Sequence, residues 1–338
     1  MKIIVDAFGG DNAPLEILKG CEMAVNENGY EILLTGDEEK IKACASENGI
    51  SLKNMTVYNA PDVISMEDHP DCILKDKSDS SMAVGMRLLA TEKGDAFVTA
   101  GSTGAAVIGS TFIVKRIKGV KRAALATILP NDDGGNFMVL DVGANVECRP
   151  EALTQFGVMG SEYMKAFLGN DNPRVGLLNV GTEDTKGGDL QKETFALLKQ
   201  MPINFIGNVE ARDIMFGAAD VIVCDGFSGN VMLKSIEGVA QFLMKNLKDV
   251  FYKSALTKLC AAPLKSSLGE FKKKLDYTEI GGAPLMGISK PVIKAHGNSK
   301  AKAFKNAVTQ AAVYVQSGAI DKISEVVKKE KNKDNEES

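Results

Sequence analysis

This 338-residue chain has no Trp, only two His, and no pair of Cys at the spacing of a metal or redox site. Its six Cys are scattered, which favours reduced thiols in the cytoplasm. No apolar run is long enough to span a bilayer, and a strand is predicted at the very start, so we expect no signal peptide. The formal net charge of −4 argues against general binding to nucleic acid.

Several motifs of nucleotide and hydrolase chemistry are also missing. The sequence contains no G-x-G-x-x-G fingerprint of dinucleotide binding and no G-x-x-x-x-G-K-[ST] phosphate loop. It has no G-x-S-x-G nucleophile elbow, because residues 226–229 carry a related sequence at the wrong spacing. A Ser-His-Asp hydrolase would have to use His296 as its base, and no motif marks a nucleophile. These absences argue against P-loop NTPases and the familiar serine hydrolases.

What the chain does have is a recurring pattern of a short apolar strand, a polar loop containing glycine, and a helix. The predicted strands that precede such loops are 3–5, 96–98, 138–140, 176–178, 204–206, 221–223 and 292–294. The alternation predicts an α/β fold with a mostly parallel sheet. We expect a single domain over residues 1–330 and a disordered, charged tail at 331–338. Loops at the carboxyl ends of parallel strands share one crevice, so the seven loops should converge on one site.

The loops carry residue types that suit oxyanions better than acid–base chemistry. Glycine lets backbone N–H groups turn toward an anion, and helix N-termini add positive potential. Lys186, Arg212 and Lys234 can supply full charges, and Asn or Ser side chains can donate to a carbonyl oxygen that gains charge. Phosphate is already ionised at neutral pH, and a thiolate with a pKa near ~8.5 leaves with little acid help. A site so poor in His therefore permits phosphorolysis of a thioester.

Each of these features also has a plain structural interpretation. A glycine-rich loop after a strand is often only a tight connection. Asp6, Asp141 and Asp225 each end a strand and could merely cap the turn that follows. His296 could cap a helix, and His69 has the surroundings of a solvated turn residue. The residues alone leave both interpretations open.

Residues 238–275 interrupt the alternation of strands and helices. Apolar residues at helical spacing on both sides of Pro263 predict a helical hairpin. Between Gln241 and Lys274 there are eight Lys and only two acidic residues, on a chain that is acidic as a whole. This excess indicates an acidic partner or an anionic surface, unless the hairpin is an ordinary amphipathic one with solvated lysines.

Read together, the loops resemble the signature segments of the bacterial phosphate acyltransferase family, PlsX. The similar segments run in order from Met1 to about Ala319 and are residues 6–14, 100–105, 141–145, 207–213, 225–231, 277–284 and 295–297. Three positions depart from the family pattern. Phe8 stands where Met is usual, Asn12 where His is common, and Ser102 where Asn is usual.

The resemblance implies an isopropylmalate-dehydrogenase-like α/β fold with a protruding helical hairpin. It implies transfer of a long-chain acyl group from acyl carrier protein to inorganic phosphate, for phospholipid biosynthesis, with no metal or other cofactor. It also implies a cytoplasmic homodimer associated peripherally with the inner face of the cell membrane, where the membrane glycerol-3-phosphate acyltransferase is a further candidate partner. The membrane contacts would be Leu256, Leu259 and Leu264 at the hairpin tip.

Within this interpretation the loop residues divide into two groups. The catalytic candidates are Asn145, Lys186, Asn208, Arg212, Asn230 and His296. Of these, Lys186, Asn208 and Arg212 are expected to hold phosphate, Asn145 and Asn230 to polarise the thioester carbonyl, and His296 to steer phosphate or the leaving thiol. The candidates for phosphate binding are Gly9, Gly10, Gly101, Ser102, Gly104, Gly226, Ser228 and Gly229.

Two rival functions remain at this point. A metal- and NAD-dependent 3-hydroxyacid dehydrogenase could use the same fold, but it would need a carboxylate cluster for the metal and a nucleotide loop that the sequence does not display. A membrane scaffold without catalytic activity could use the basic hairpin. It would leave the seven glycine-containing loops unexplained.

Overall fold

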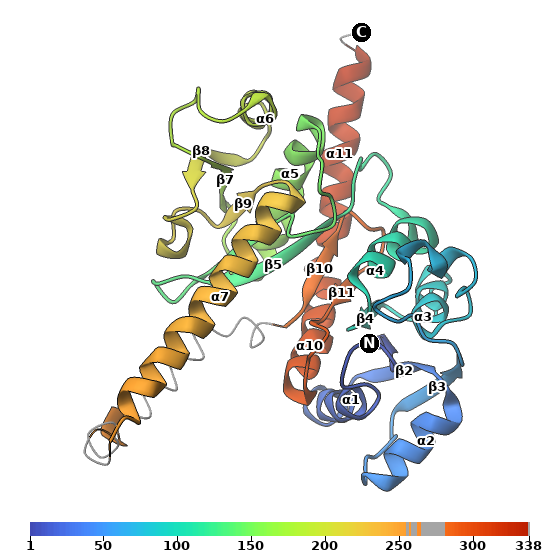
Figure 1. Cartoon of the computed structure of the whole chain (residues 1–338). Helices are drawn as coiled ribbons and strands as arrows, with labels where there is room; N and C mark the ends of the chain where they lie inside the picture. Colours follow the sequence, from blue (N-terminus) through green and yellow to red (C-terminus); the bar gives the residue numbers. More distant parts are fainter. Residues whose placement is uncertain (255–256, 258–261, 265–280, 337–338) are drawn as a thin grey trace.

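The computed structural model describes residues 1–254, 257, 262–264 and 281–336 (Figure 1). Within these residues, one 11-stranded sheet forms the framework of the molecule. From one edge to the other, its strands are β3 (Met55–Asn59), β2 (Glu31–Gly36), β1 (Lys2–Asp6), β4 (Ala96–Thr99), β11 (Val292–Lys294), β10 (Ala283–Met286), β5 (Ala124–Pro130), β6 (Asn136–Leu140), β9 (Val221–Val223), β7 (Arg174–Asn179) and β8 (Asn204–Glu210).

Most neighbouring strands in this sheet run parallel. The strands from β3 to β11 pair in parallel in one half, and those from β6 to β8 do so in the other. Between the halves, β10 pairs antiparallel with β11 and β5, and β5 pairs antiparallel with β6. The predicted α/β class with a mostly parallel sheet is confirmed. We call these two halves, with the helices that pack on them, the two lobes. Figure 1 shows the lobes side by side, joined by the antiparallel strands.

Helices cover both faces of the sheet. One core contains residues of α1 (Leu15–Asn28), α2 (Glu38–Glu47), α5 (Pro150–Leu168), α6 (Asp189–Leu198), α10 (Ala301–Ser317) and α11 (Ala319–Glu336). The core on the other face contains residues of α3 (Ser81–Ala90), α4 (Thr103–Gly109) and α7 (Gly226–Phe251). Short helical turns complete the chain: η1 (Pro70–Leu74), η2 (Ser110–Lys115), η3 (Ile214–Phe216) and η4 (Ala262–Leu264).

The strand residues alternate between these two cores. In β1, Ile3 and Val5 pack on the face covered by α1 and α10, whereas Ile4 packs on the face covered by α3. Side chains of a strand point alternately to opposite faces, and here both faces are buried. The strand is therefore apolar without interruption until Asp6, where it ends and the loop begins.

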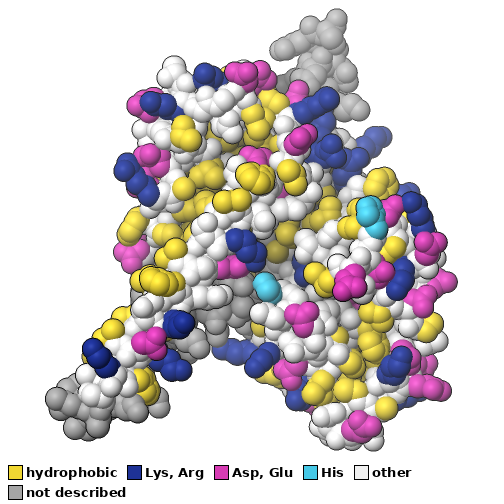
Figure 2. Space-filling model, viewed as in Figure 1, with side chains coloured by type: hydrophobic (Ala, Val, Ile, Leu, Met, Phe, Trp, Pro, Cys, Tyr) yellow, Lys and Arg dark blue, Asp and Glu magenta, His cyan; other side chains and the backbone are white. Residues whose placement is uncertain are grey.

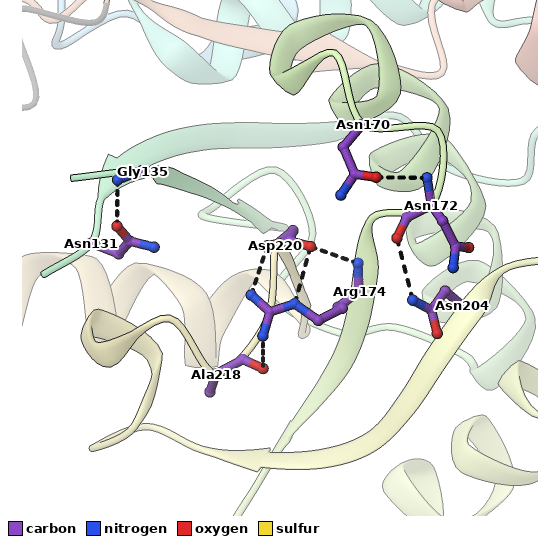
Figure 3. A network of polar contacts seen from close by, with 8 residues as sticks. All are labelled: Asn131, Gly135, Asn170, Asn172, Arg174, Asn204, Ala218 and Asp220. Carbon is purple, nitrogen blue, oxygen red and sulfur yellow. Dashed lines mark hydrogen bonds and ion pairs between the residues drawn. The ribbon is translucent and has the colours of Figure 1, made fainter. Parts of the chain in front are cut away.

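A network of hydrogen bonds links the amino-terminal ends of β7, β8 and β9 at one edge of the sheet (Figure 3). The backbone N–H and Nε of Arg174, at the start of β7, donate to Asp220 Oδ2 at 2.8 and 3.2 Å, and Nη2 donates to Oδ1 at 2.9 Å. Asp220 directly precedes β9. Beside this pair, Asn204 of β8 donates to the carbonyl oxygen of Asn172 at 3.2 Å. These contacts fix the end of the edge strands that lies opposite the glycine-containing loops.

The 26-residue helix α7 projects away from both lobes (Figure 1). It forms the first arm of the hairpin predicted over residues 238–275. The second arm and the residues Leu256 and Leu259 of the predicted tip lie outside the described residues. Leu264 is described, in η4, with 46% of its surface exposed.

At the carboxyl end, α11 continues to Glu336 and so includes most of the segment 331–338, where the sequence analysis expects a disordered tail. Lys and Glu are good helix formers, which accounts for a charged segment extending an existing helix. The single-domain boundary at residue 330 stays a prediction. Among the described residues, no helix is both long and apolar enough to cross a membrane.

Candidate functional site

Two hollows lie beside α7. The central cleft, of about 470 Å³, lies between the lobes and is lined by residues that include Asp11, Gly101, Gly143, Asn230, Lys234, Lys294 and His296. The apolar groove, of about 830 Å³, is lined by residues that include Leu177, Arg212, Met215, Phe227, Val231, Ile236 and Val239. Figure 2 shows hydrophobic side chains gathered along the course of α7 and on the lobe beside it.

The two hollows share α7 but use different faces of it. Asn230, Leu233, Lys234 and Glu237 line the central cleft, at the i, i+3, i+4 and i+7 spacing of one helix face. The residues of α7 that line the apolar groove are Phe227, Ser228, Val231, Met232, Ser235, Ile236, Val239, Ala240 and Leu243. The helix therefore separates a hollow with charged walls from one with mainly apolar walls.

The expectation that all seven loops converge on one site is wrong in part. Loops after β1, β4, β6 and β11 reach the central cleft, but those after β7 and β8 contribute Asn179 and Arg212 to the apolar groove. The loop after β9 contributes Cys224 and Asp225 to the apolar groove, and the helix α7 that follows it borders both hollows. The physical reason is strand order, because β7 and β8 lie beyond β9 at the sheet edge and α7 stands between them and the cleft.

The loops after β1 and β4 are held too closely for side chains at their glycines. A Cβ on Gly9 would lie 2.6 Å from the backbone nitrogen of Gly101, and Gly10 adopts a φ of +97°. The Asp6 carboxylate accepts from Thr99 Oγ1 at 2.7 Å and from the backbone N–H of Phe8 at 3.2 Å. These glycines thus have a packing role, and only Gly101 of them also lines the cleft.

The loop after β6 is organised by the Asp141 carboxylate. Its Oδ1 accepts from the backbone N–H groups of Leu125, Gly143 and Ala144, each at 3.0 Å. Its Oδ2 accepts from both the backbone and the side-chain nitrogen of Asn145 at 2.8 Å. Asn145 Nδ2 also donates to the Ala123 carbonyl at 2.7 Å, so protein oxygens engage both of its N–H bonds. Its role in polarising a thioester stays a prediction.

The start of α7 packs directly on this loop. A Cβ on Gly226 would lie 2.5 Å from the carbonyl oxygen of Asn145, and one on Gly229 only 1.9 Å from that of Asp141. The Asp225 carboxylate caps α7 by accepting from the N–H and hydroxyl of Ser228, both at 2.8 Å. All three strand-end aspartates thus accept hydrogen bonds from the loop or helical turn that follows them. Phosphate binding by Gly226, Ser228 and Gly229 stays a prediction.

The three residues expected to hold phosphate lie on the side of the apolar groove. Asn208 Nδ2 donates to the carbonyl oxygen of Glu183 at 2.8 Å. Lys186 lies 3.9 Å from the Glu183 carboxylate. Arg212 pairs with Glu210 at 2.8 Å, and its side chain is 78% exposed. They are thus separated from Asn230 and His296, which line the central cleft, and their phosphate contacts stay a prediction.

The three departures from the family pattern have structural contacts. Asn12 donates from Nδ2 to the carbonyl oxygen of Asn298 at 3.1 Å and so ties the loops after β1 and β11 together. Ser102 caps α4, and the next turn packs closely, since a Cβ on Gly104 would lie 2.7 Å from Pro70. The ring of Phe8 lies against Gly36. None of these contacts tests a role in binding.

His296 lies at the rim of the central cleft. Burial, followed by the nearby charge of Lys234, lowers its pKa below the usual value. Its Nδ1 accepts from the backbone N–H of Asn298 at 3.4 Å. Lys234 itself pairs with Glu237 at 2.7 Å along α7. In the described part of the chain, no group of three or more His, Cys, Asp or Glu side chains has the arrangement of a metal site.

Among the residues of the cleft that the sequence did not mark as candidates is Lys294. It ends the buried strand β11, and only 7% of its surface is exposed. Its Nζ donates to the carbonyl oxygens of Ala100, at 3.2 Å, and of Ala295. Burial lowers its pKa to about 8. The available signal was a lysine within an apolar central strand, where an unpaired charge is rare.

Comparison of the sequence with known proteins identifies a family and close relatives. A family model described as "Fatty acid synthesis protein" matches residues 1–322. The phosphate acyltransferase of Bacillus licheniformis is 48% identical over 328 residues, which cover 97% of this chain and 98% of the relative. Further curated relatives carry the same name.

Solved structures with much lower identity share the fold. A phosphotransacetylase from Streptococcus pyogenes aligns with a TM-score of 0.63 and 17% identity, covering 95% of this chain and 94% of the other. A protein provisionally named 4-hydroxythreonine-4-phosphate dehydrogenase, from Salmonella typhimurium, aligns with a TM-score of 0.54 and 11% identity, covering 93% and 99%. Near-complete matches at high identity carry more weight, and they show that this chain belongs to the bacterial phosphate acyltransferase family and is an acyltransferase.

Proposed function

We propose that this enzyme transfers a long-chain acyl group from acyl carrier protein to inorganic phosphate, giving acyl phosphate for phospholipid biosynthesis. The family supplies the reaction class. The observation that carries the proposal is the central cleft, where Lys234, Lys294, Asn230 and a neutral His296 surround a hollow large enough for phosphate and a thioester.

The chemistry requires few protein groups. A phosphate oxygen attacks the thioester carbonyl, the carbon–sulfur bond breaks, and the thiolate takes the proton that hydrogen phosphate carried. Phosphate is an anionic nucleophile, so the site must position it and neutralise its charge. Asn230 supplies an amide at the cleft for the carbonyl oxygen as it gains charge. His296, whose pKa burial lowers, would guide the leaving sulfur.

The exposed side chains of α7 support three proposed partners: the carrier protein, a second copy of the chain and the membrane surface. Its exposed side chains include the basic Lys245 and Lys248, which suit an acidic carrier protein. Its exposed apolar side chains, such as Val239 and Phe242, suit a second copy of the chain in a homodimer. The same helix would lead to a membrane-contacting tip with basic flanks, so binding to the inner face of the membrane should be weak and dependent on anionic lipid.

Purified enzyme should be incubated with long-chain acyl-carrier protein and inorganic phosphate. Free carrier thiol and acyl phosphate, trapped by hydroxylamine, should appear in equal amounts and only when phosphate is present. Parallel reactions contain a chelator, or Mg²⁺ with a nicotinamide nucleotide. Turnover that requires metal and nucleotide, with a hydroxyacid as substrate, would favour the dehydrogenase instead.

A second assay tests the membrane contact. Vesicles with anionic lipid should float with the wild-type protein, and added salt should release it, because screening weakens the attraction of lysines to the surface. Leu259→Glu should abolish flotation while turnover with soluble carrier protein continues. Equal flotation of this variant would mean that Leu259 does not anchor the enzyme.

A further inference from the structure

Lys294 occupies the most enclosed position of any charged side chain that lines the central cleft. It ends β11, which lies between β4 and β10 in the middle of the sheet. Only 7% of its surface is exposed, and that part borders the cleft. The sequence thus places a cation on the floor of the proposed reaction site.

The hydrogen-bond partners of Lys294 are carbonyl oxygens and not carboxylates. An ammonium has three N–H donors, and two of them serve the carbonyl oxygens of Ala100 and Ala295. Within the described residues, Lys294 has no ion pair. The Asp6 carboxylate, which lies on the same side of the sheet, is engaged by Thr99 and by the backbone of Phe8. One donor of the Lys294 ammonium therefore remains for a ligand.

A buried cation without a partner is unfavourable, and proteins rarely keep one without a use. The pKa of Lys294 reflects this unfavourable free energy of burial. Burial lowers the pKa of Lys294 to about 8, although Asp6 and Asp11 act in the opposite direction. An anion in the cleft would supply a counter-charge in direct contact with the ammonium. The charged and titratable groups that line the cleft with Lys294 are Asp11, Lys234, Glu237 and His296, and Asp6 is a further carboxylate whose charge acts on Lys294.

We propose that the Lys294 ammonium binds an oxygen of the inorganic phosphate in the central cleft and so fixes the position of the nucleophile. This assignment rests on the proposed function. It places the phosphate on the cleft side of α7, away from Lys186, Asn208 and Arg212. Lys294 keeps its proton throughout, because the proton for the departing thiolate comes from hydrogen phosphate.

Binding of the anion alone tests the assignment without turnover. Titration calorimetry with inorganic phosphate should show an affinity at least about tenfold lower for Lys294→Met than for the wild type, as expected when a charge-assisted hydrogen bond is lost. Lys290→Met is the matched control, because this lysine precedes the same strand and pairs with Glu92 on the surface. It should bind phosphate like the wild type. Equal affinity of Lys294→Met and wild type would overturn the assignment.

The pH dependence gives a second test that needs no variant. Sulfate stays a dianion over the range used, so changes in its affinity report on the protein. An ammonium is required for binding, so affinity should be full below about pH 8 and should fall as the pH rises further; an ordinary lysine would lose it only near ~10.4. Sulfate affinity that stays constant up to about pH 11, where even an ordinary lysine has lost most of its protons, would contradict the role of Lys294 even if Lys294→Met failed to fold.

Steady-state kinetics separates this inference from the proposed function. Lys294→Met should raise the KM for phosphate by at least about tenfold and leave the KM for acyl-carrier protein nearly unchanged. If the KM for the carrier substrate rises instead, Lys294 contacts the carrier substrate, and the inference fails while the function stands. If phosphate binding depends on Lys294 but no acyl phosphate forms, the function fails and the anion site stands.

Discussion

The two faces of α7 show how one helix can serve different purposes. The face toward the central cleft presents Asn230 and Lys234, among loops that hydrogen bonds and close glycine packing hold in place. The opposite face presents Phe227 and Val231 to the wider apolar groove, and beyond it Phe242 is 64% exposed. Preorganised polar groups suit a reaction that develops charge. Exposed apolar surface suits association.

Gly229→Ala should cause the largest loss of stability among the substitutions considered on and around α7. The added Cβ would lie 1.9 Å from the Asp141 carbonyl oxygen, so α7 must move away from the loop that it packs on. We expect a loss of about 3 kcal/mol or more in the free energy of unfolding, measured by urea denaturation. Gly238→Ala is the control, since a Cβ there meets nothing within 4 Å, and it should stabilise by about 0.5–1 kcal/mol. Equal effects of the two substitutions would contradict the close packing at Gly229.

A smaller loss should follow from Asp220→Ala, which removes the acceptor of three bonds from Arg174 at the far end of the strands. The pair is partly buried, so we expect a loss of about 1–3 kcal/mol in stability with KM values unchanged. Asp184→Ala breaks the exposed pair with Lys199 and should cost less than about 1 kcal/mol. A change in KM for phosphate in Asp220→Ala would mean that this end of the sheet is coupled to the cleft.

Phe242→Glu should weaken the association of two copies of the chain and leave the stability of each copy unchanged. It places a charge on the exposed apolar surface of α7, beyond the apolar groove. If a second copy covers this surface, the dimer dissociation constant should rise by at least about tenfold, since burial of one large side chain contributes about 1.5–3 kcal/mol. Sedimentation velocity over a concentration series measures this. An unchanged dimer would show that the homodimer uses another surface, whereas a monomeric wild type would contradict the dimer itself.

The sequence predicted much of this fold because its strands and loops have strong local signals. Helices α1, α4 and α5 begin at Leu15, Thr103 and Pro150, behind three of the predicted strands and their loops. The antiparallel strands β5 and β10 were not predicted. Their pairing joins residues distant in the chain, and no local pattern specifies it.

The site was less predictable than the fold. Glycines and aspartates at strand ends marked loops that border the two hollows. The contacts of Gly229 and Asp141 show that these residues also hold the loops and α7 together. The division of loops between cleft and groove depends on strand order, which the sequence does not reveal. Lys294 was missed because the pattern marked loops, whereas this charge belongs to the last residue of a strand.

Adjacent residues on α7 provide the most direct test of the central claim that chemistry takes place in the cleft. Asn230 lines the cleft and Val231 lines the groove. Rates of acyl phosphate formation should be measured for Asn230→Ala and Val231→Ala at protein concentrations where both are dimeric. The account predicts a fall of roughly 10²–10³ in kcat for Asn230→Ala, from loss of a donor to the developing charge, and a near-normal kcat for Val231→Ala. A normal kcat for Asn230→Ala with a large loss for Val231→Ala would contradict it.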